Sequence, residues 1–171
     1  MSEAITSPVD VRPFREADLA ALERRWPTAG VHAAHAAAHV AGRATYLVAW
    51  NGPEPLGVLM VQWAGCVGPR AAAAHPEAVE FNHVQVRESA RGRGVGTALL
   101  VAAERLAAAR GVATAAVGVA EDNPGARRLY ERCGYVETGV VDRTAYDWVD
   151  DAGGTHHAVE LDHLLVKDLR D

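Results

Sequence analysis

Hydrophobic residues recur with two different periods along this chain of 171 residues. Short runs that alternate with polar residues, or that are continuously apolar and rich in β-branched side chains, predict strands. Apolar residues three and four positions apart predict helices. We therefore expect strands over residues 9–14, 44–50, 56–63, 79–87, 112–120, 135–148 and 157–167. We expect helices over residues 16–26, 29–42, 97–110 and between Asn123 and Gly134.

Residues with special backbone preferences mark the ends of these elements. Pro27 ends the first helix, and Asn51-Gly52 predicts a hairpin between the second and third strands. Residues 66–76 carry glycine, two prolines and an alanine run, and we expect a loop there. No internal repeat or linker interrupts the order of strands and helices. The sequence therefore predicts one mixed α/β domain over residues 1–171.

Composition narrows the class of protein. A hydrophobic content of 49% with 23% charged residues is ordinary for a soluble globular protein. The formal net charge is −5, and no run is dense in lysine or arginine, which argues against a nucleic-acid binder. The same negative charge is compatible with a cationic partner such as an amine.

Cysteine usage and the start of the chain predict the compartment. Cys66 and Cys133 form no C-x-x-C pair, as expected of reduced thiols in a cytoplasmic protein. Residues 1–10 lack the basic start and apolar core of a signal peptide. No apolar stretch reaches about 18 residues, so we expect no association with a membrane.

A glycine-rich turn over residues 91–97 (RGRGVGT) lies between a predicted strand and a predicted helix. Such a turn exposes unpaired backbone N–H groups at the positive end of the helix dipole, which predicts an anion site. A Walker-type loop would need lysine after its last glycine, whereas Thr97 follows Gly96. A dinucleotide fingerprint would need G-x-G-x-x-G in the first βα turn, whereas this loop has G-x-G-x-G and lies mid-chain. The alternative is that these glycines only allow the chain to enter the helix and bind no ligand.

Two signatures carry a resemblance to a known family. Residues 86–96 fit V-x-x-x-x-R-G-x-G-x-G, which contains the acyl-coenzyme A signature R-x-x-G-x-G. Residues 123–135 (NPGARRLYERCGY) fit N-x-x-A-x-x-L-Y-x-x-x-G-F/Y, and residues 11–19 and 165–169 are typical of the same chains. The sequence thus resembles the GNAT superfamily of N-acetyltransferases over nearly its full length. Glu88 stands where many members carry proline, which should alter the rigidity of the loop more than its chemistry.

The resemblance implies a fold and a co-substrate. It implies a single-domain GNAT-like α/β fold, with a mixed, mostly antiparallel sheet of about seven strands flanked by about four helices. It also implies acetyl-CoA as co-substrate, with no metal. Its binding residues are expected to be Val84, Val86, Arg91, Gly92, Arg93, Gly94, Val95, Gly96, Thr97, Asn123 and Ala126. In the alternative interpretation, Arg91 or Arg93 is a solvated surface residue that does not contact coenzyme A. The alternative for Asn123 is that it only caps a helix.

Glu80 is the first candidate for the base that takes a proton from the acceptor amine. Several family members carry a catalytic or water-positioning glutamate six residues before the Val86 position. Side chains alternate along a strand, so Glu80 should share a face with Asn82, Val84 and Val86. Since an ordinary carboxylate is a poor base toward an ammonium, we expect a raised pKa or a water relay. A strand-end glutamate in solvent or a salt bridge is the alternative.

His83 is the second candidate, with an intrinsic pKa that suits a base better. Strand parity places it on the face opposite Glu80, unless a bulge intervenes. A packed histidine is the alternative. The resemblance makes Tyr130 the general acid toward the sulfur of coenzyme A, against the alternative of a core tyrosine. It also implies an oxyanion donor in the backbone near residues 84–86, where the fourth and fifth strands should splay apart.

His32, His35 and His39 lie on one stripe of a predicted helix, but no carboxylate or cysteine accompanies them. We expect packed or solvated histidines, or contacts to substrate, and no metal site. The predicted function is transfer of an acetyl group from acetyl-CoA to a primary amine by direct attack. The acceptor is a small-molecule amine or a peptide N-terminus, and the sequence leaves a homodimer open. A catalytically degenerate acyl-CoA sensor or structural module is the alternative, and a nicotinamide-dependent oxidoreductase is a third.

Overall fold

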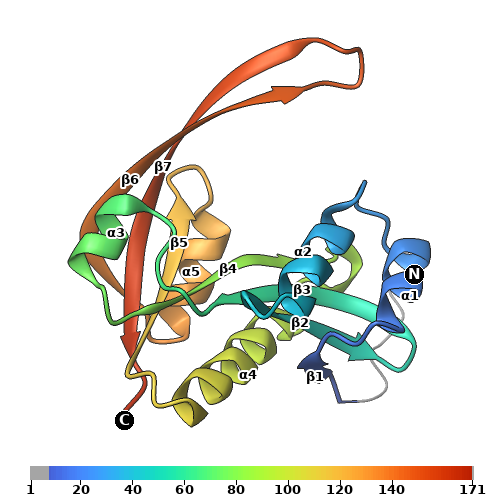
Figure 1. The fold of residues 1–171 in the computed structure, drawn as a ribbon, viewed down its shortest axis with the longest axis horizontal. Helices are drawn as coiled ribbons and strands as arrows, with labels where there is room; N and C mark the ends of the chain where they lie inside the picture. The colour runs from blue at the N-terminus through green and yellow to red at the C-terminus, as the bar shows by residue number, and fades with distance from the viewer. Residues whose placement is uncertain (1–7, 171) are drawn as a thin grey trace.

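The computed structural model describes residues 8–170, so the start of the leader, residues 1–7, lies outside the described part. Seven strands form one sheet in the order β1-β2-β3-β4-β5-β7-β6 (Figure 1). The strands are β1 (Asp10–Pro13), β2 (Ala44–Asn51), β3 (Glu54–Gln62), β4 (Val79–Val86), β5 (Thr114–Ala120), β6 (Val136–Val149) and β7 (Thr155–Asp168). The helices are α1 (Asp18–Arg25), α2 (Val31–Val40), α3 (Pro69–Ala74), α4 (Val95–Ala109) and α5 (Pro124–Arg132), with a 3-10 turn at Glu88–Ala90.

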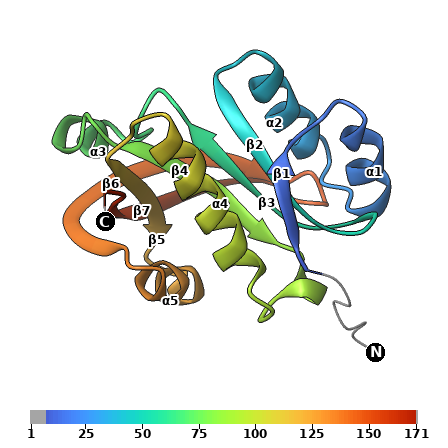
Figure 2. The same ribbon diagram turned by 90° about the horizontal axis from the view of Figure 1, so that it is seen from below.

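The sheet is mixed and mostly antiparallel, as predicted. Its one parallel pair joins β4 to β5, and β7 lies between β5 and β6. The crossover from β4 to β5 runs through α4, which lies along the middle of the sheet (Figure 2). Parallel strands need such a connection, because the chain must return to the end of the sheet where the first strand began before the second strand can start.

Each face of the sheet has its own core, because the central strands are apolar on both sides. Leu47, Leu59 and Phe81 face α4 and α5, together with Leu99 of α4. On the opposite face, Tyr46 and its neighbours on β2 and β3 pack against α1 and α2. A third cluster lies beside α3 and includes Ala71, Ala78, Ala116 and Leu164. The sheet is therefore covered by α4 and α5 on one side and by α1, α2 and α3 on the other.

One expected loop contains a helix, and most ends of the expected elements differ from the structure by one or two residues. The loop expected over residues 66–76 contains α3, whose first residue is Pro69. Asp142 of β6 accepts hydrogen bonds from the backbone N–H groups of Arg70 and Ala71 at 2.9 and 3.0 Å. A partner 72 residues away caps this helix, so its local sequence could not reveal it. Helix α4, for example, begins at Val95 rather than at Thr97.

A bulge interrupts β4 and corrects the expected parity of its side chains. Val58 of β3 pairs with Gln85 and Met60 pairs with Asn82, so two residues of β4 lie opposite one residue of β3. His83, in the bulge, has a φ of 50°, which is unusual for a residue other than glycine. The expectation that Glu80, Asn82, Val84 and Val86 share one face is therefore wrong. The extra residue moves the two valines to the opposite face, where they pack against the core beside α4.

The expected splay between β4 and β5 is present. The two strands pair only from Val79 to Phe81 on β4 and from Ala115 to Val117 on β5. Both continue beyond this point, β4 to Val86 and β5 to Ala120, without pairing to each other. The sheet therefore opens between them on the side where the bulge lies.

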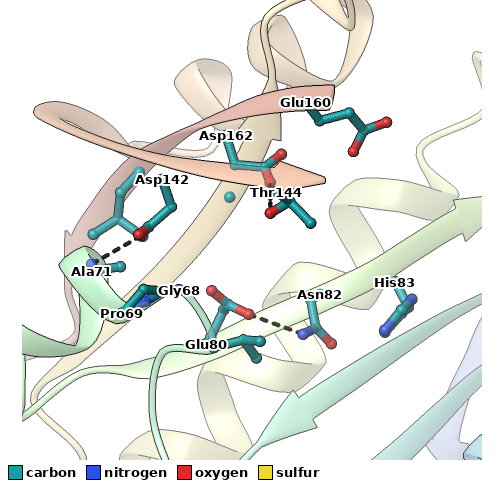
Figure 3. A pocket seen from close by; sticks show the side chains of 13 residues that line it. Gly68, Pro69, Ala71, Glu80, Asn82, His83, Asp142, Thr144, Glu160 and Asp162 are labelled. Atoms are coloured by element: carbon teal, nitrogen blue, oxygen red, sulfur yellow. Dashed lines mark hydrogen bonds between the residues drawn. The ribbon is translucent and has the colours of Figure 1, made fainter. Parts of the chain in front are cut away.

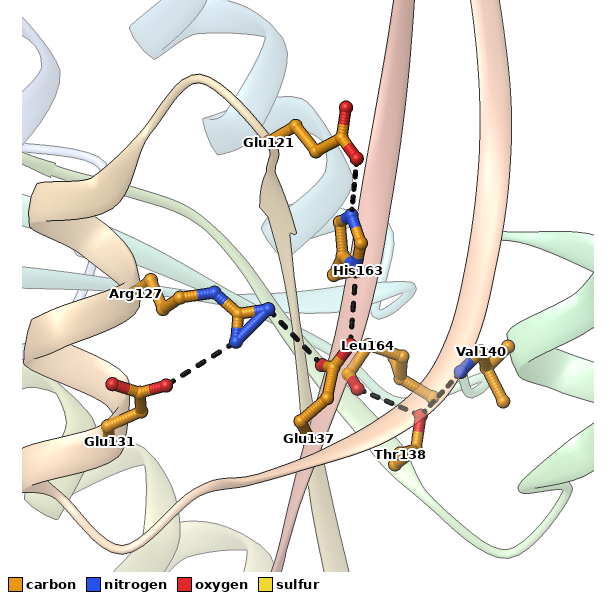
Figure 4. Close-up of polar contacts among 8 residues, drawn as sticks. All are labelled: Glu121, Arg127, Glu131, Glu137, Thr138, Val140, His163 and Leu164. Atoms are coloured by element: carbon orange, nitrogen blue, oxygen red, sulfur yellow. Dashed lines mark hydrogen bonds and ion pairs between the residues drawn. The ribbon is translucent and has the colours of Figure 1, made fainter.

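Strands β6 and β7 form a long curved ribbon that extends past the helices (Figure 1). A polar network on one face ties its base to α5 (Figure 4). His163 contacts Glu121 and Glu137 through its two ring nitrogens at 3.2 and 3.1 Å, and Arg127 of α5 pairs with Glu137 at 3.5 Å. Among the described residues, no helix is long and apolar enough to cross a bilayer.

Candidate active site

The glycine-rich turn leads directly into α4 and leaves its first N–H groups unpaired. Gly94 is the N-cap and has a φ of 78°, a conformation that a side chain with a Cβ rarely adopts. Gly96 serves close packing instead, because a Cβ there would lie 2.8 Å from Leu129 of α5. This packing holds α4 against α5, and the amino ends of both helices line one pocket, where their dipoles favour an anion.

A pocket of about 600 Å³ lies at these two helix ends. The expected coenzyme A residues on its wall are Val84, Val86, Arg91, Gly92, Gly94, Val95, Gly96, Thr97, Asn123 and Ala126. Arg93 is half-buried and is not on this wall. Gln85, Ala90, Gly125, Leu129 and Arg132 line the pocket as well and were not expected. The guanidinium of Arg91 donates to the carbonyl of Val86 at 3.3 Å, which holds it at the rim.

Asn123 has the capping role expected of it. Its side-chain oxygen accepts a hydrogen bond from the N–H of Ala126 at 3.2 Å, which satisfies one free donor of α5. Pro124 occupies the first turn of the same helix, where its missing N–H costs nothing. Because Asn123 also lines the pocket, its capping bond fixes that part of the wall.

A second pocket, of about 440 Å³, lies on the opposite face of the sheet, beside α3 and the β6–β7 ribbon. Glu80, Asn82 and His83 of β4 form one wall, and residues of β6 and β7 form the other (Figure 3). The bulge brings His83 onto the same wall as Glu80, although unbroken parity would separate them. The residues that face them are Asp142, Thr144, Glu160, Asp162 and Leu164.

Glu80 is 7% exposed and its carboxylate points into this second pocket (Figure 3). Burial raises the pKa of Glu80, and the charges of Asp162 and Asp142 add to the rise. Hydrogen bonds from Asn82, at 2.9 Å, and from the backbone of Val67 oppose it. A raised pKa makes this carboxylate a stronger base than an ordinary glutamate.

The ring of His83 contacts that of His35 of α2 at a tilt of 48°, with centroids 4.7 Å apart. Burial lowers the pKa of both histidines, to about 4 for His35, where the charge of His83 is the second cause. The histidine stripe of α2 is otherwise packed. His32 contacts the hydroxyl of Tyr46 at 2.6 Å, and His39 accepts from the N–H of Tyr46 at 3.0 Å. Within the described residues, no group of three or more potential ligands could hold a metal ion.

Tyr130 is 6% exposed and belongs to the core beside α4 and α5. Its ring meets that of Tyr135 edge-on, with centroids 6.1 Å apart. Burial raises the pKa of Tyr130 to about 12, and the negative charge of Glu80 contributes. The two expected catalytic groups therefore lie within electrostatic range of each other, one on each side of the sheet's opening.

The acidic wall of the second pocket was not found from the sequence. Asp142 and Thr144 on β6, and Glu160 and Asp162 on β7, occupy alternate positions of two predicted strands. That alternation places each pair on one face of its strand, so a polar face could have been noticed. Nothing in the sequence indicated that this face lies opposite Glu80.

Comparison with known proteins decides the family. Residues 11–135 match the profile of the Acetyltransferase (GNAT) family, which is well over half of the chain. The chain belongs to this family. The glycine-loop signature and the α5 signature of this GNAT protein both lie inside the matched region, whereas strands β6 and β7 lie beyond it. No curated protein matches the sequence significantly.

Solved structures share the GNAT fold at low sequence identity. An N-acetyltransferase from Staphylococcus aureus Mu50 is 19% identical, with a TM-score of 0.67 over 96% of this chain and 100% of that one. A putative acetyltransferase from Salmonella typhimurium, solved with acetyl-CoA, is 18% identical, with a TM-score of 0.64 over 96% of both chains. The ribosomal-protein-S18-alanine N-acetyltransferase from Escherichia coli is 18% identical, with a TM-score of 0.64 over 94% of both. The predicted fold class is confirmed.

Proposed function

We propose that this GNAT protein transfers an acetyl group from acetyl-CoA to a primary amine by direct attack. The observation that carries the proposal is the bulge of β4. His83 lines the pocket with Glu80, while the next residue, Val84, lines the pocket at the glycine loop. One strand therefore contributes to both pockets at the point where β4 and β5 separate. A thioester reaching through this opening would meet an amine bound on the other side.

In this proposal the pocket of about 600 Å³ holds acetyl-CoA. The pyrophosphate accepts hydrogen bonds from the backbone N–H groups of residues 94–97, and Arg91 adds positive charge at the rim. The pantetheine arm runs between Val84 and Val86 on one side and Asn123 and Ala126 on the other. Acetyl-CoA or coenzyme A is bound in the Salmonella typhimurium structure and in a Bacillus subtilis acetyltransferase with 20% identity, which supports the assignment.

Glu80 takes the proton from the acceptor, directly or through one water. The amine nitrogen then attacks the carbonyl carbon of the thioester and forms the new N–C bond. A backbone N–H in residues 84–86, free of β5 because of the splay, stabilises the oxyanion. Alkylammonium groups have a pKa of about 10, far above that of an ordinary carboxyl group. A raised pKa of Glu80 reduces the difference between the two and makes the proton transfer less unfavourable. His83 is the competing base, and burial lowers its pKa, which makes it a weaker base than an ordinary histidine.

Tyr130 assists departure of the sulfur when the C–S bond breaks and its electron pair leaves with coenzyme A. With a pKa raised to about 12, Tyr130 stays protonated at neutral pH, as a donor must. Complete proton transfer to a thiolate is unfavourable, because thiols have a pKa of about 8.5. Tyr130 therefore acts by donating a hydrogen bond to the sulfur, and the proton lost by the amine balances the released thiol.

The test is release of free coenzyme A thiol from acetyl-CoA over a panel of primary amines and peptide N-termini. We expect release that depends on the acceptor and saturates with it. If coenzyme A binds but no acceptor causes thiol release, the chain is instead an acyl-CoA sensor or structural module. A thermal shift with NADH, and none with acetyl-CoA, would contradict both interpretations and favour the oxidoreductase.

The base assignment has its own test. His83→Asn removes the imidazole but keeps the bulge, because asparagine tolerates a positive φ. Glu80→Gln removes the carboxylate and keeps a hydrogen-bond acceptor for Asn82. We expect kcat/KM of the wild type to rise with pH as Glu80 loses its proton. Glu80→Gln should lose this rise, and His83→Asn should retain it. The reverse pattern would assign the base to His83.

A further inference from the structure

The second pocket is strongly acidic, and its walls offer almost no compensating positive charge. Glu80, Asp142, Glu160 and Asp162 all line it. Of the lining residues that the structure describes, only His83 can become cationic, and burial lowers its pKa. The position of this pocket at the opening between β4 and β5 makes it the acceptor site under the proposed function. Its charge then determines which amines it accepts.

Two of the four carboxylates already have strong partners. Asp142 accepts the backbone N–H groups of Arg70 and Ala71 at the start of α3. Glu80 accepts a hydrogen bond from Asn82 at 2.9 Å. These two are held by the fold itself and need no ligand to satisfy them.

The two carboxylates of β7 have weaker partners. Among the described residues, Asp162 accepts only from the hydroxyl of Thr144, at 3.3 Å, and Glu160 only from the hydroxyl of Tyr146, at 3.0 Å. Neither forms an ion pair with any residue in the described part of the chain. Both therefore retain acceptor capacity directed along the pocket and the adjoining face of the ribbon.

The arrangement of these negative charges lowers the stability of the folded state. Asp162 lies directly opposite Asp142 in the ladder between β6 and β7, and Glu160 follows two residues away on the same face. Like charges directly opposite each other in a sheet are destabilising. Burial and the charges of Glu160 and Asp142 raise the pKa of Asp162, which reflects the same cost. A cation bound between these carboxylates would offset it.

Spacing along β7 suggests an extended ligand. Two residues of one strand are about 6.6 Å apart, so Asp162 and Glu160 form successive contact points leading outward. Glu80 lies across the pocket from β7, within electrostatic range of Asp162 (Figure 3). An aliphatic chain with nitrogens at both ends could place one at Glu80 and the other beside β7.

We infer that, given the proposed acetyl transfer, the acceptor is a small polycationic amine. Its reacting nitrogen lies at Glu80, and a second ammonium is held by Asp162 and Glu160. An acceptor with a carboxylate in place of the second ammonium would be repelled by the same residues. Asp162 and Glu160 thus act as specificity-determining residues.

The test compares acceptors of similar length that end in different groups. Putrescine ends in a second ammonium, butylamine in a methyl group and γ-aminobutyrate in a carboxylate, and a peptide with a free N-terminal alanine represents the protein acceptors. We expect kcat/KM from thiol release to be at least tenfold higher for putrescine than for butylamine, as one charge-assisted hydrogen bond would give. We expect γ-aminobutyrate to be the poorest. Equal values for putrescine and butylamine, or a preference for the peptide, would overturn the inference while leaving acetyl transfer intact.

Variants of β7 locate the second ammonium. We expect Asp162→Asn with Glu160→Gln to reduce the ratio of kcat/KM for putrescine to that for butylamine by tenfold or more. Asp147→Asn is the matched control, because Asp147 lies on the opposite face of the ribbon and pairs with His157 at 2.8 Å. The control should keep the wild-type ratio. An unchanged ratio in the double variant would contradict the assignment of these two residues.

A binding measurement separates this inference from the proposed function. If no acceptor causes thiol release, the proposed function fails, yet calorimetric titration of putrescine into the complex with coenzyme A still tests the pocket. Putrescine should bind at least tenfold more tightly than butylamine, and the double variant should remove the difference. Equal binding of the two amines would overturn the inference.

Discussion

Gly94 is the N-cap of α4, in the glycine-rich turn to which we assign coenzyme A binding. It has a φ of 78°, and a Cβ at this position would meet no atom within 4 Å, so the space where a phosphate would approach is open. We predict that Gly94→Val abolishes coenzyme A binding, because a β-branched residue disfavours this conformation and fills that space. Calorimetric titration with coenzyme A measures the effect.

Gly111 provides a matched control for this substitution. It also has a φ of 78° and open space around it, but it follows the far end of α4. Gly111→Val should therefore cost similar backbone strain, of about 1–3 kcal/mol, and leave coenzyme A binding intact. Tight binding by a folded Gly94→Val variant would contradict the assignment of the loop.

Tyr130 and Tyr135 are two buried tyrosines in contact, and replacing each by phenylalanine should affect a different property, kcat for Tyr130 and stability for Tyr135. Removing the Tyr130 hydroxyl should reduce kcat by roughly 10²–10⁴-fold with little loss of stability, if it contacts the leaving sulfur. The Tyr135 hydroxyl donates to Glu104 at 3.0 Å, so Tyr135→Phe should cost about 1.5–3 kcal/mol of stability and spare kcat. Steady-state kinetics and chemical denaturation of both variants check this, and an unaffected kcat in Tyr130→Phe would exclude the donor role.

Asp162 links function to stability. Its raised pKa means that the folded state favours the protonated form, so wild-type stability falls as pH rises through that pKa. We predict that Asp162→Asn raises the Tm at pH 7, and that its advantage shrinks as pH falls toward the ordinary range of an aspartate. Thermal melts from pH 4 to pH 8 measure the difference. A variant less stable than the wild type at pH 7 would show that the carboxylate is satisfied in the fold.

Single residues also show how far sequence reasoning reaches. The loop glycines, Asn123 and Tyr130 belong to local signatures, so their positions could be predicted from spacing alone. Asp162 and Glu160 belong to no such signature, because their significance depends on β7 lying opposite β4 in space. Arg93 belongs to the same signature but does not line the pocket, since spacing gives the path of the backbone and not the direction of a flexible side chain.

At the scale of elements, the attachment of the β6–β7 ribbon to the rest of the fold includes hydrogen bonds of a titratable residue, His163. His163 interacts with Glu121 and Glu137, and these hydrogen bonds raise its pKa (Figure 4). A raised histidine pKa gives stability that is fully present below about pH 6.5, the unfolded value, and is lost as pH rises through the folded value. We predict that the wild type loses more stability than His163→Gln between pH 6 and pH 9.

Thermal denaturation of both proteins at low and high salt checks this prediction. The difference should diminish at high salt, because His163 and its partners are partly exposed. Parallel pH dependence of the two proteins would mean that His163 contributes nothing through its charge.

Two elements show why local pattern failed where it did. Helix α3 has few residues and little amphipathic signal, and its N-terminal groups are satisfied by Asp142 from β6. The β4 bulge inserts one residue, His83, and shifts the phase of alternation, so that Val84 and Val86 join Val79 and Phe81 in the core beside α4. The consecutive polar residues Asn82 and His83 are the trace of this shift in the sequence. Both features depend on tertiary contacts, and both shape the proposed acceptor pocket.

For the whole molecule, the order of elements and the cofactor side could be predicted, whereas the acceptor side could not. Strands β1 to β5, with the splay between β4 and β5, lie within the region that matches the family, and the resemblance implied them. The acidic wall comes from the β6–β7 ribbon, which lies beyond residue 135 and therefore outside the region that matches the family. The residues of the proposed coenzyme A pocket thus belong mostly to local motifs, whereas those of the proposed acceptor pocket come together through the tertiary fold.

The central claim is that the two pockets join at the β4 bulge and that acetyl crosses between them. Mass spectrometry of a mixture of enzyme, acetyl-CoA and putrescine tests it most directly, with Gly94→Val as the inactive control. The account predicts acetylated putrescine in an amount equal to the coenzyme A thiol released, and neither product above background with the control. Thiol release without an acetylated amine, or equal product from the control, would contradict it.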